Sequence, residues 1–188
     1  MITLGTGVGG GIIMGKEIFN GCDGMGAEIG HTKLVCNGIR CTCGQYGCFE
    51  SYASATALIR QTKDAIRTHP DSLLIKECGG DLDKADARTA FDAMRKGDAT
   101  AAQVVDQYIS YLAAGLSTLI TIFRPQVIIV GGGISNEGDT LLRPLNEKVF
   151  TSTFAAEEIG VPPVVAAKLG NDAGIIGAAM LGKQTQRN

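Results

Sequence analysis

Residues 21–47 constrain this chain more than any other segment, because so long a stretch has no sustained helical or strand periodicity. Glycine and cysteine dominate it, and a loop of this length inside a compact domain needs something to hold it. Cys41, Cys43 and Cys48 lie near its end, and His31 precedes them. Three thiolates and one imidazole complete the tetrahedral shell that structural zinc prefers. The sequence therefore predicts a zinc ion that organises the loop.

The alternative interpretation of these three cysteines is that they are small buried thiols, since free cysteine is among the most buried residue types. The spacing of the ligands and the loop's need for support favour zinc. Cys22 and Cys36 have no spare partner in the sequence, so we expect ordinary thiols at both positions.

Charge and composition exclude several classes of function. The formal net charge is −2, with 17 basic and 19 acidic side chains, and no basic run is present. Nothing therefore attracts the chain to nucleic acid or to anionic lipid. Aromatic residues make up 5% and Trp is absent, which argues against a stacking platform for bases. Apolar stretches are too short to span a membrane and no signal peptide is visible, so we expect a cytoplasmic location.

The spacing of apolar residues predicts an α/β fold, because strand-like and helix-like segments alternate along the chain. The expected strands are residues 2–4, 12–14, 127–130 and 161–167, and the expected helices are residues 51–67, 101–123, 139–150 and 172–181. Residues 68–99 are charged and interrupted by glycine. We expect one or two surface helices there, without chemistry.

Two glycine clusters follow expected strands. The first occupies residues 5–11, and the second is the run of three glycines at residues 131–133. Backbone N–H groups in such clusters can point at phosphate oxygens, but a hairpin between two strands can use the same residues. Taken alone, the clusters leave both interpretations open.

Two longer motifs give a resemblance to a known family. Residues 41–50 (Cys-Thr-Cys-Gly-Gln-Tyr-Gly-Cys-Phe-Glu) resemble, at every defining position, the CxCGxxGCxE motif of the ROK family (repressors, open reading frames and kinases). Residues 28–31 (Glu-Ile-Gly-His) are similar to the family's ExGH motif, at the expected distance before it. The glycines of residues 5–11 look like the family's glycine-rich signature. The resemblance runs from Thr3 to about Leu181.

This resemblance implies the actin-like (ribonuclease H-like) ATPase fold, in which two α/β domains close around ATP and a hexose. It implies that residues 1–188 form the C-terminal domain, with the zinc loop at about 22–50 and a helical excursion at about 68–99. It also implies a role for each matching residue: His31, Cys41, Cys43 and Cys48 as zinc ligands, Glu28, His31 and Glu50 as contacts of the sugar hydroxyls, Thr6 and Gly7 as contacts of the ATP phosphates, and Gly131, Gly132 and Gly133 as the border of the adenosine.

Elementary chemistry agrees with these roles. Carboxylates accept hydrogen bonds from hydroxyls, and a site built in this way rejects analogues that lack them. A histidine can bind zinc with one ring nitrogen and a hydroxyl with the other. Zinc with four protein ligands has no open position, so it would fix the His31 ring instead of acting as a Lewis acid.

The implied function is ATP-dependent phosphorylation of glucose at the 6-hydroxyl, with Mg²⁺ accompanying ATP. A complete kinase of this family also has a DxGGT-like phosphate loop and an aspartate that takes the proton from the attacking hydroxyl. No match for either precedes Gly5. We therefore expect the catalytic base in an N-terminal domain outside this chain, and little or no activity from the chain alone. Apolar surface that would meet that domain leads us to expect a homodimer.

Three alternatives remain open at this point. The chain could be the sugar-sensing domain of a ROK transcriptional repressor, or part of a kinase for another hexose such as N-acetylmannosamine or fructose. It could also be a degenerate, non-catalytic remnant with a sugar-binding or structural role. The segment 50–56 resembles glucokinases more than N-acetylhexosamine kinases, which favours glucose.

Overall fold

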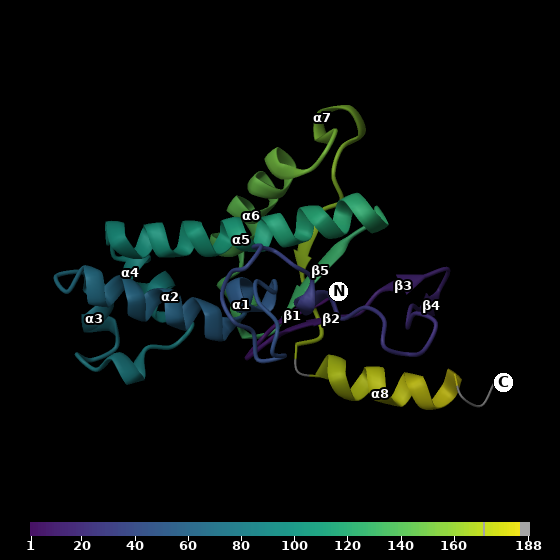
Figure 1. Cartoon of the computed structure of the whole chain (residues 1–188), viewed down its shortest axis with the longest axis horizontal. Helices are drawn as coiled ribbons and strands as arrows, with labels where there is room; N and C mark the ends of the chain where they lie inside the picture. The colour runs from purple at the N-terminus through teal and green to yellow at the C-terminus, as the bar shows by residue number, and fades with distance from the viewer. Residues whose placement is uncertain (171, 185–188) are drawn as a thin grey trace.

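The computed structural model describes the backbone of residues 1–170 and 172–184. Its main sheet has four strands in the order β2-β1-β5-β6 (Figure 1). β1 is antiparallel to β2 and parallel to β5, and β5 is parallel to β6. A separate two-stranded sheet joins β3 and β4. The strands are β1 Ile2–Leu4, β2 Val8–Gly10, β3 Ile13–Met14, β4 Glu17–Ile18, β5 Ile128–Gly131 and β6 Val164–Ala166.

The long helix α5 is the element on which most other helices pack. It contacts α1, α2, α4 and α6 (Figure 1). The α-helices are α1 Glu50–Ala53, α2 Ala55–Thr68, α3 Leu73–Glu77, α4 Thr89–Arg95, α5 Ala99–Phe123, α6 Asp139–Ser152, α7 Ala156–Ile159 and α8 Asp172–Gln184. The described part of the chain also contains the 3-10 helices η1 Ile29–His31, η2 Leu82–Lys84 and η3 Gly133–Glu137. None of the described helices is both long and apolar enough to cross a membrane.

Both ends of α5 follow from the sequence. Asp98 caps its start, where the carboxylate accepts a 2.6 Å hydrogen bond from the Ala101 N–H. Arg124 ends it in the left-handed region at φ 43°, directly before a proline. Between these ends an apolar stripe that includes Leu112 and Leu116 is fully buried. Burial of each such side chain contributes about 1.5–3 kcal/mol, so α5 organises the core.

The parallel pairing of β1 and β5 brings the two glycine clusters to one edge of the sheet. Thr3 pairs with Gly131, so the turn after β1 and the loop after β5 leave the sheet side by side. Gly132 has φ 89°, and a Cβ there would lie 2.3 Å from the Leu4 carbonyl oxygen. Only glycine therefore allows the loop to lie this close to the end of β1.

Several expected elements differ from the structure. The expected helix at 51–67 is divided at Ser54, whose side chain accepts a 3.1 Å hydrogen bond from the Ala57 N–H and caps α2. The glycine cluster at 5–11 contains β2, so it forms a hairpin with β1. The hairpin interpretation of this cluster is therefore confirmed. The phosphate interpretation stays a prediction for residues 5–7, the turn of the hairpin.

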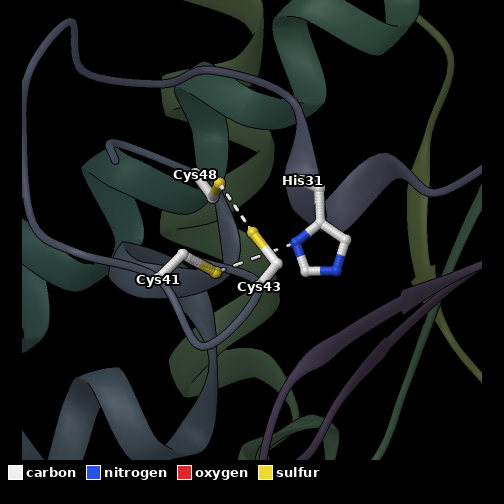
Figure 2. Close-up of side chains that lie close together, drawn as sticks. All are labelled: His31, Cys41, Cys43 and Cys48. Atoms are coloured by element: carbon white, nitrogen blue, oxygen red, sulfur yellow. Dashed lines mark hydrogen bonds between the residues drawn. The ribbon is translucent and has the colours of Figure 1, made fainter. Parts of the chain in front are cut away.

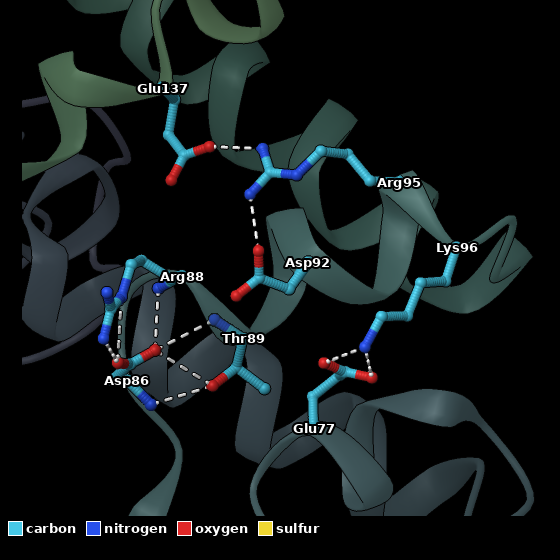
Figure 3. A network of polar contacts seen from close by, with 8 residues as sticks. All are labelled: Glu77, Asp86, Arg88, Thr89, Asp92, Arg95, Lys96 and Glu137. Carbon is cyan, nitrogen blue, oxygen red and sulfur yellow. Dashed lines mark hydrogen bonds and ion pairs between the residues drawn. The ribbon is translucent and has the colours of Figure 1, made fainter.

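The segment 68–99 contains α3 and α4 and contributes to the core. Leu74 and Phe91 are fully buried, although the segment is highly charged. Charged side chains occupy its outer face, where Lys96 pairs with Glu77 at 2.6 Å (Figure 3). Arg95 of α4 also donates a 2.6 Å hydrogen bond to Glu137 in η3, just after the second glycine cluster. The segment is therefore tied to the loop that follows β5.

Candidate metal centre and glycine turns

His31, Cys41, Cys43 and Cys48 converge on one point (Figure 2). One potential ligand atom from each lies within 4.8 Å of the others. Nδ1 of His31 is 3.7 Å from Sγ of Cys41, and Sγ of Cys43 is 3.7 Å from Sγ of Cys48. Zinc–sulfur bonds of about 2.3 Å in a tetrahedron place the ligand atoms roughly 3.8 Å apart, so the cluster fits zinc. The structure thus brings together the four residues that the sequence singled out.

Tight backbone turns hold the cysteines in place. Gly47 accepts a 2.8 Å hydrogen bond from the Leu34 N–H and donates one of 2.8 Å to the Ile39 carbonyl. A Cβ at Gly47 would lie 1.7 Å from the Val35 carbonyl oxygen, so only glycine fits. Phe49, which follows the last cysteine, is 1% exposed and anchors the loop in the core. The cluster is therefore fixed by local hydrogen bonds and by one buried aromatic ring.

The thiols differ in their acidity without a metal ion. Burial raises the pKa of the Cys41 thiol, but hydrogen bonds from Cys43, Ser51 and His31 outweigh it and lower the pKa to about 7. Burial, together with the neighbouring thiols, raises the pKa of Cys48 to about 11. Thiolates that share so small a volume repel one another, so a cation at their centre would favour the ionised forms of all three.

The two predicted sugar-contacting carboxylates have different surroundings. Glu28 is exposed at the start of η1, and its side chain makes no capping hydrogen bond. Glu50 is partly buried: its Oε2 accepts a 3.0 Å hydrogen bond from the Val8 N–H, and its Oε1 accepts one of 3.2 Å from Thr42. Its Oε1 is also 3.6 Å from Sγ of Cys41. Glu50 therefore connects the metal cluster to the hairpin that carries the first glycine cluster.

The five predicted nucleotide-contacting residues lie at one edge of the sheet. Thr6 and Gly7 lie in the turn between β1 and β2, Gly131 is the last residue of β5, and Gly132 and Gly133 follow it. Gly7 lies against Glu50, because a Cβ there would be 2.2 Å from the Oε2 atom. Two surface hollows, of about 290 Å³ beside α2 and α5 and about 550 Å³ beside α6 and β6, include none of these residues. Thr6, Gly132 and Gly133 are exposed and Gly7 is half-buried, whereas Gly131 is buried.

Sequence reasoning missed two residues that hold the turn after β1. The Ala55 N–H donates a 2.8 Å hydrogen bond to the Gly5 carbonyl, and the Thr56 hydroxyl donates one of 2.8 Å to the Thr6 carbonyl. The only available signal was their position directly after the Ser54 cap, which places them in the first turn of a helix.

Comparison with known proteins identifies related chains. A family model described as the ROK family matches residues 1–185. The chain is 43% identical over 183 residues to a glucokinase of Thermotoga maritima, covering 97% of this chain and 57% of that protein. A solved structure, a ROK family glucokinase from Streptomyces griseus in complex with glucose and AMPPNP, superposes with a TM-score of 0.89 at 38% identity. That match covers 97% of this chain and 59% of the other.

A second solved structure, the ROK hexokinase from Thermus thermophilus, gives a TM-score of 0.80 at 30% identity. It covers 100% of this chain and 57% of the other. The chain therefore spans somewhat more than half the length of the relatives it matches.

Proposed function

The chain belongs to the ROK family, and from this membership we propose that it is the C-terminal portion of an ATP-dependent hexokinase that phosphorylates glucose at the 6-hydroxyl. The observation that carries the proposal is the position of Glu50. One carboxylate oxygen contacts the hairpin proposed to hold phosphates, and the other lies beside the metal cluster. A hexose held at this carboxylate would lie next to the phosphate-binding turn, as phosphoryl transfer requires.

The proposed sugar site uses His31, Glu28 and Glu50. Nδ1 of His31 faces Cys41, and Figure 2 shows the other ring nitrogen pointing away from the sulfurs, where it can meet a hydroxyl. A zinc ion bound by the four ligands would have no open position and would fix this ring. Among the described residues the Glu28 side chain makes no hydrogen bond, so its carboxylate oxygens can accept from hydroxyls, and Glu50 retains acceptor capacity beyond its three protein contacts.

The proposed nucleotide site uses the two glycine clusters. Backbone N–H groups of Thr6 and Gly7 would bind phosphate oxygens, and residues 131–133 would border the adenosine. Phosphoryl transfer depends on positioning and on neutralising phosphate charge, which Mg²⁺ supplies together with these donors. The proton of the attacking hydroxyl needs a base, which we expect from an N-terminal domain. We therefore expect the 188-residue chain on its own to bind ligands but to show little or no turnover.

Three further expectations belong to this proposal: a cytoplasmic location, a homodimer and no direct contact with nucleic acid. The homodimer is supported by large apolar side chains on the surface, among them Phe154 at 80% and Ile175 at 75% exposure. The absence of nucleic-acid contact is supported by the net charge of −2.

Calorimetric titration of the purified chain with glucose, and separately with Mg-AMPPNP, tests the function. We expect both to bind, and Glu28→Gln to weaken glucose binding about tenfold, because Gln keeps an acceptor oxygen and loses only the extra ~1–1.5 kcal/mol of a hydrogen bond to a charged group. Glu17→Gln, at an exposed glutamate of β4, is the matched control and should leave glucose binding unchanged.

Other outcomes would select another function. Binding of N-acetylmannosamine or fructose in preference to glucose would make the chain part of a different hexose kinase. Glucose binding without AMPPNP binding, in a chain that unfolds cooperatively, would favour the sugar-sensing domain of a repressor or a sugar-binding remnant. Kinase activity of the chain alone would refute the expected need for an external base.

A further inference from the structure

The turn between β1 and β2 has all three of its carbonyl groups occupied. The Gly5 carbonyl accepts a 2.8 Å hydrogen bond from the Ala55 N–H, and the Thr6 carbonyl accepts one of 2.8 Å from the Thr56 hydroxyl. The Gly7 carbonyl accepts from the Gly5 N–H at 3.0 Å. Two of these three donors come from the first two residues of α2, so the start of that helix fixes the orientation of the turn.

The N–H groups of the same turn face the other way. No peptide bond in the described chain is cis, and in a trans peptide the C=O and N–H groups point in opposite directions. Because the Gly5 and Thr6 carbonyls point toward α2, the N–H groups of Thr6 and Gly7 point away from it. Within the described residues neither of these N–H groups donates a hydrogen bond. Two consecutive free donors at an open turn are suited to an anion such as phosphate.

The charge around the turn has two opposing sources. The N-terminus of α2, a helix of 14 residues, carries partial positive charge and lies against the turn. The Glu50 carboxylate is the negative group in contact with the same hairpin, and its Oε2 is bound to the Val8 N–H. That bond occupies the next N–H along the chain, so the Thr6 and Gly7 donors remain for a ligand.

We propose that Thr56 is a positioning residue for the nucleotide phosphates, because its hydroxyl holds the Thr6–Gly7 peptide with the Gly7 N–H directed at the ligand. Thr56 acts through this peptide and does not itself contact the phosphates. The inference rests on the proposed function, since it requires that the turn binds the nucleotide. It adds a residue that the motifs do not assign and explains why a hydroxyl stands at this exposed position.

Three substitutions separate this role from a general effect on stability. Thr56→Val keeps the shape of the side chain and removes its donor, whereas Thr56→Ser keeps the donor. Thr118→Val is the matched control. The Thr118 hydroxyl is exposed on α5 and donates a 3.1 Å hydrogen bond to the Ala114 carbonyl of its own helix. Each variant of the chain is titrated with Mg-AMPPNP and separately with glucose, and its melting temperature is recorded.

We expect Thr56→Val to weaken AMPPNP binding about three- to tenfold, the range given by the loss of one hydrogen bond. Glucose binding should not change, Thr56→Ser should restore wild-type affinity, and the control should behave as wild type. Equal AMPPNP affinity in Thr56→Val and wild type would refute the role of Thr56 while the proposed function stands. If Thr56→Val lowered AMPPNP affinity, glucose affinity and melting temperature together, Thr56 would have only a structural role, and the proposed positioning role would be refuted.

A measurement on the wild-type chain gives an answer even if Thr56→Val does not fold. In a chain labelled with ¹⁵N-glycine, saturating AMPPNP should shift the Gly7 amide resonance and leave that of Gly15, in the turn between β3 and β4, in place. Binding of AMPPNP without a shift at Gly7 would overturn the inference alone. A folded wild-type chain that binds no AMPPNP would overturn the nucleotide part of the proposed function and the inference with it.

Discussion

Replacement of Gly115 by alanine tests how the metal loop is anchored to the central helix. Gly115 lies in α5, and Phe49 packs directly over it. A Cβ at this position would lie 2.2 Å, 2.4 Å and 2.6 Å from three atoms of the Phe49 ring. Phe49 is 1% exposed and stands between Cys48 and Glu50, so any shift of its ring reaches both the metal cluster and the carboxylate.

Two opposing effects determine how far Gly115→Ala changes the free energy of unfolding. Alanine is the better helix former by about 1 kcal/mol, which alone would stabilise the protein. Carbon atoms pack at about 3.5–4.0 Å, so the ring would have to move by more than about 1 Å. Overpacking of this kind costs about 1–3 kcal/mol, and a rigid, fully buried ring places Gly115→Ala at the upper end. We therefore expect a net loss of about 2 kcal/mol in the free energy of unfolding.

Urea denaturation followed by circular dichroism measures this difference. Gly177→Ala is the matched control, because Gly177 also lies in a helix but a Cβ there would meet nothing within 4 Å. The control should be neutral or more stable by up to about 1 kcal/mol. Gly115→Ala with wild-type stability or better would refute the reasoning, since it would mean that Phe49 does not constrain the helix surface. In the presence of zinc, Gly115→Ala should also release the metal faster to a chromophoric chelator.

Three further predictions concern the metal, acid stability and a buried hydroxyl. Elemental analysis should find one zinc per chain, and Cys43→Ser should bind less zinc. A strong chelator should lower the melting temperature; an unchanged melting temperature would contradict the ligand assignment. Burial raises the pKa of the Asp98 carboxyl, but hydrogen bonds from Ala101 and the start of α3 outweigh it and lower the pKa. The stabilisation is then present above the unfolded pKa of about 3.9 and is lost as pH falls through the lower folded value. Urea midpoints should therefore show Asp98→Asn less stable than wild type at pH 7, with the difference shrinking below about pH 4. A difference that stays the same at every pH would mean that the charge of Asp98 is not the source of the stabilisation. The Tyr108 hydroxyl donates a 2.8 Å hydrogen bond to the buried Ala53 carbonyl of α1, so Tyr108→Phe should lower the free energy of unfolding by about 1–3 kcal/mol in urea denaturation. Tyr111→Phe should change it by almost nothing, because Tyr111 is half-buried and its hydroxyl makes no hydrogen bond among the described residues.

The metal cluster could be predicted from the sequence because its ligands are close together in the chain. His31 and the three cysteines belong to one loop, so their spacing already limits the geometry they can form. The motifs also identified the family, and the expected α/β, actin-like fold is confirmed by the similarity to ROK sugar kinases at TM-scores of 0.89 and 0.80. Local pattern and family resemblance were sufficient for these features.

The details of the sheet could not be predicted in the same way. β2 consists of Val8 and two glycines, and glycine has a low preference for strands, so only its pairing with β1 makes it a strand. The division of the helix at Ser54 was missed because apolar spacing continues through it, while the cap and the turn are side-chain effects. Short strands and internal caps depend on tertiary partners that periodicity does not reveal.

The contact of Glu50 with Val8 is the clearest case of information that only the fold supplies. The two residues are 42 positions apart in the sequence. The sequence predicted a sugar contact for Glu50 and a phosphate contact for the turn beside Val8, with no link between the two. Because a single carboxylate contacts both, the two proposed sites cannot be altered independently. A glutamine at this position could keep both contacts in one orientation, with its carbonyl oxygen accepting from the Val8 N–H and its NH₂ group donating to the Thr42 hydroxyl, because a hydroxyl can also accept. The hydrogen bonds of the protein therefore fix the place of the residue 50 side chain without requiring its charge, so an effect of Glu50→Gln on ligand binding would report the charge itself.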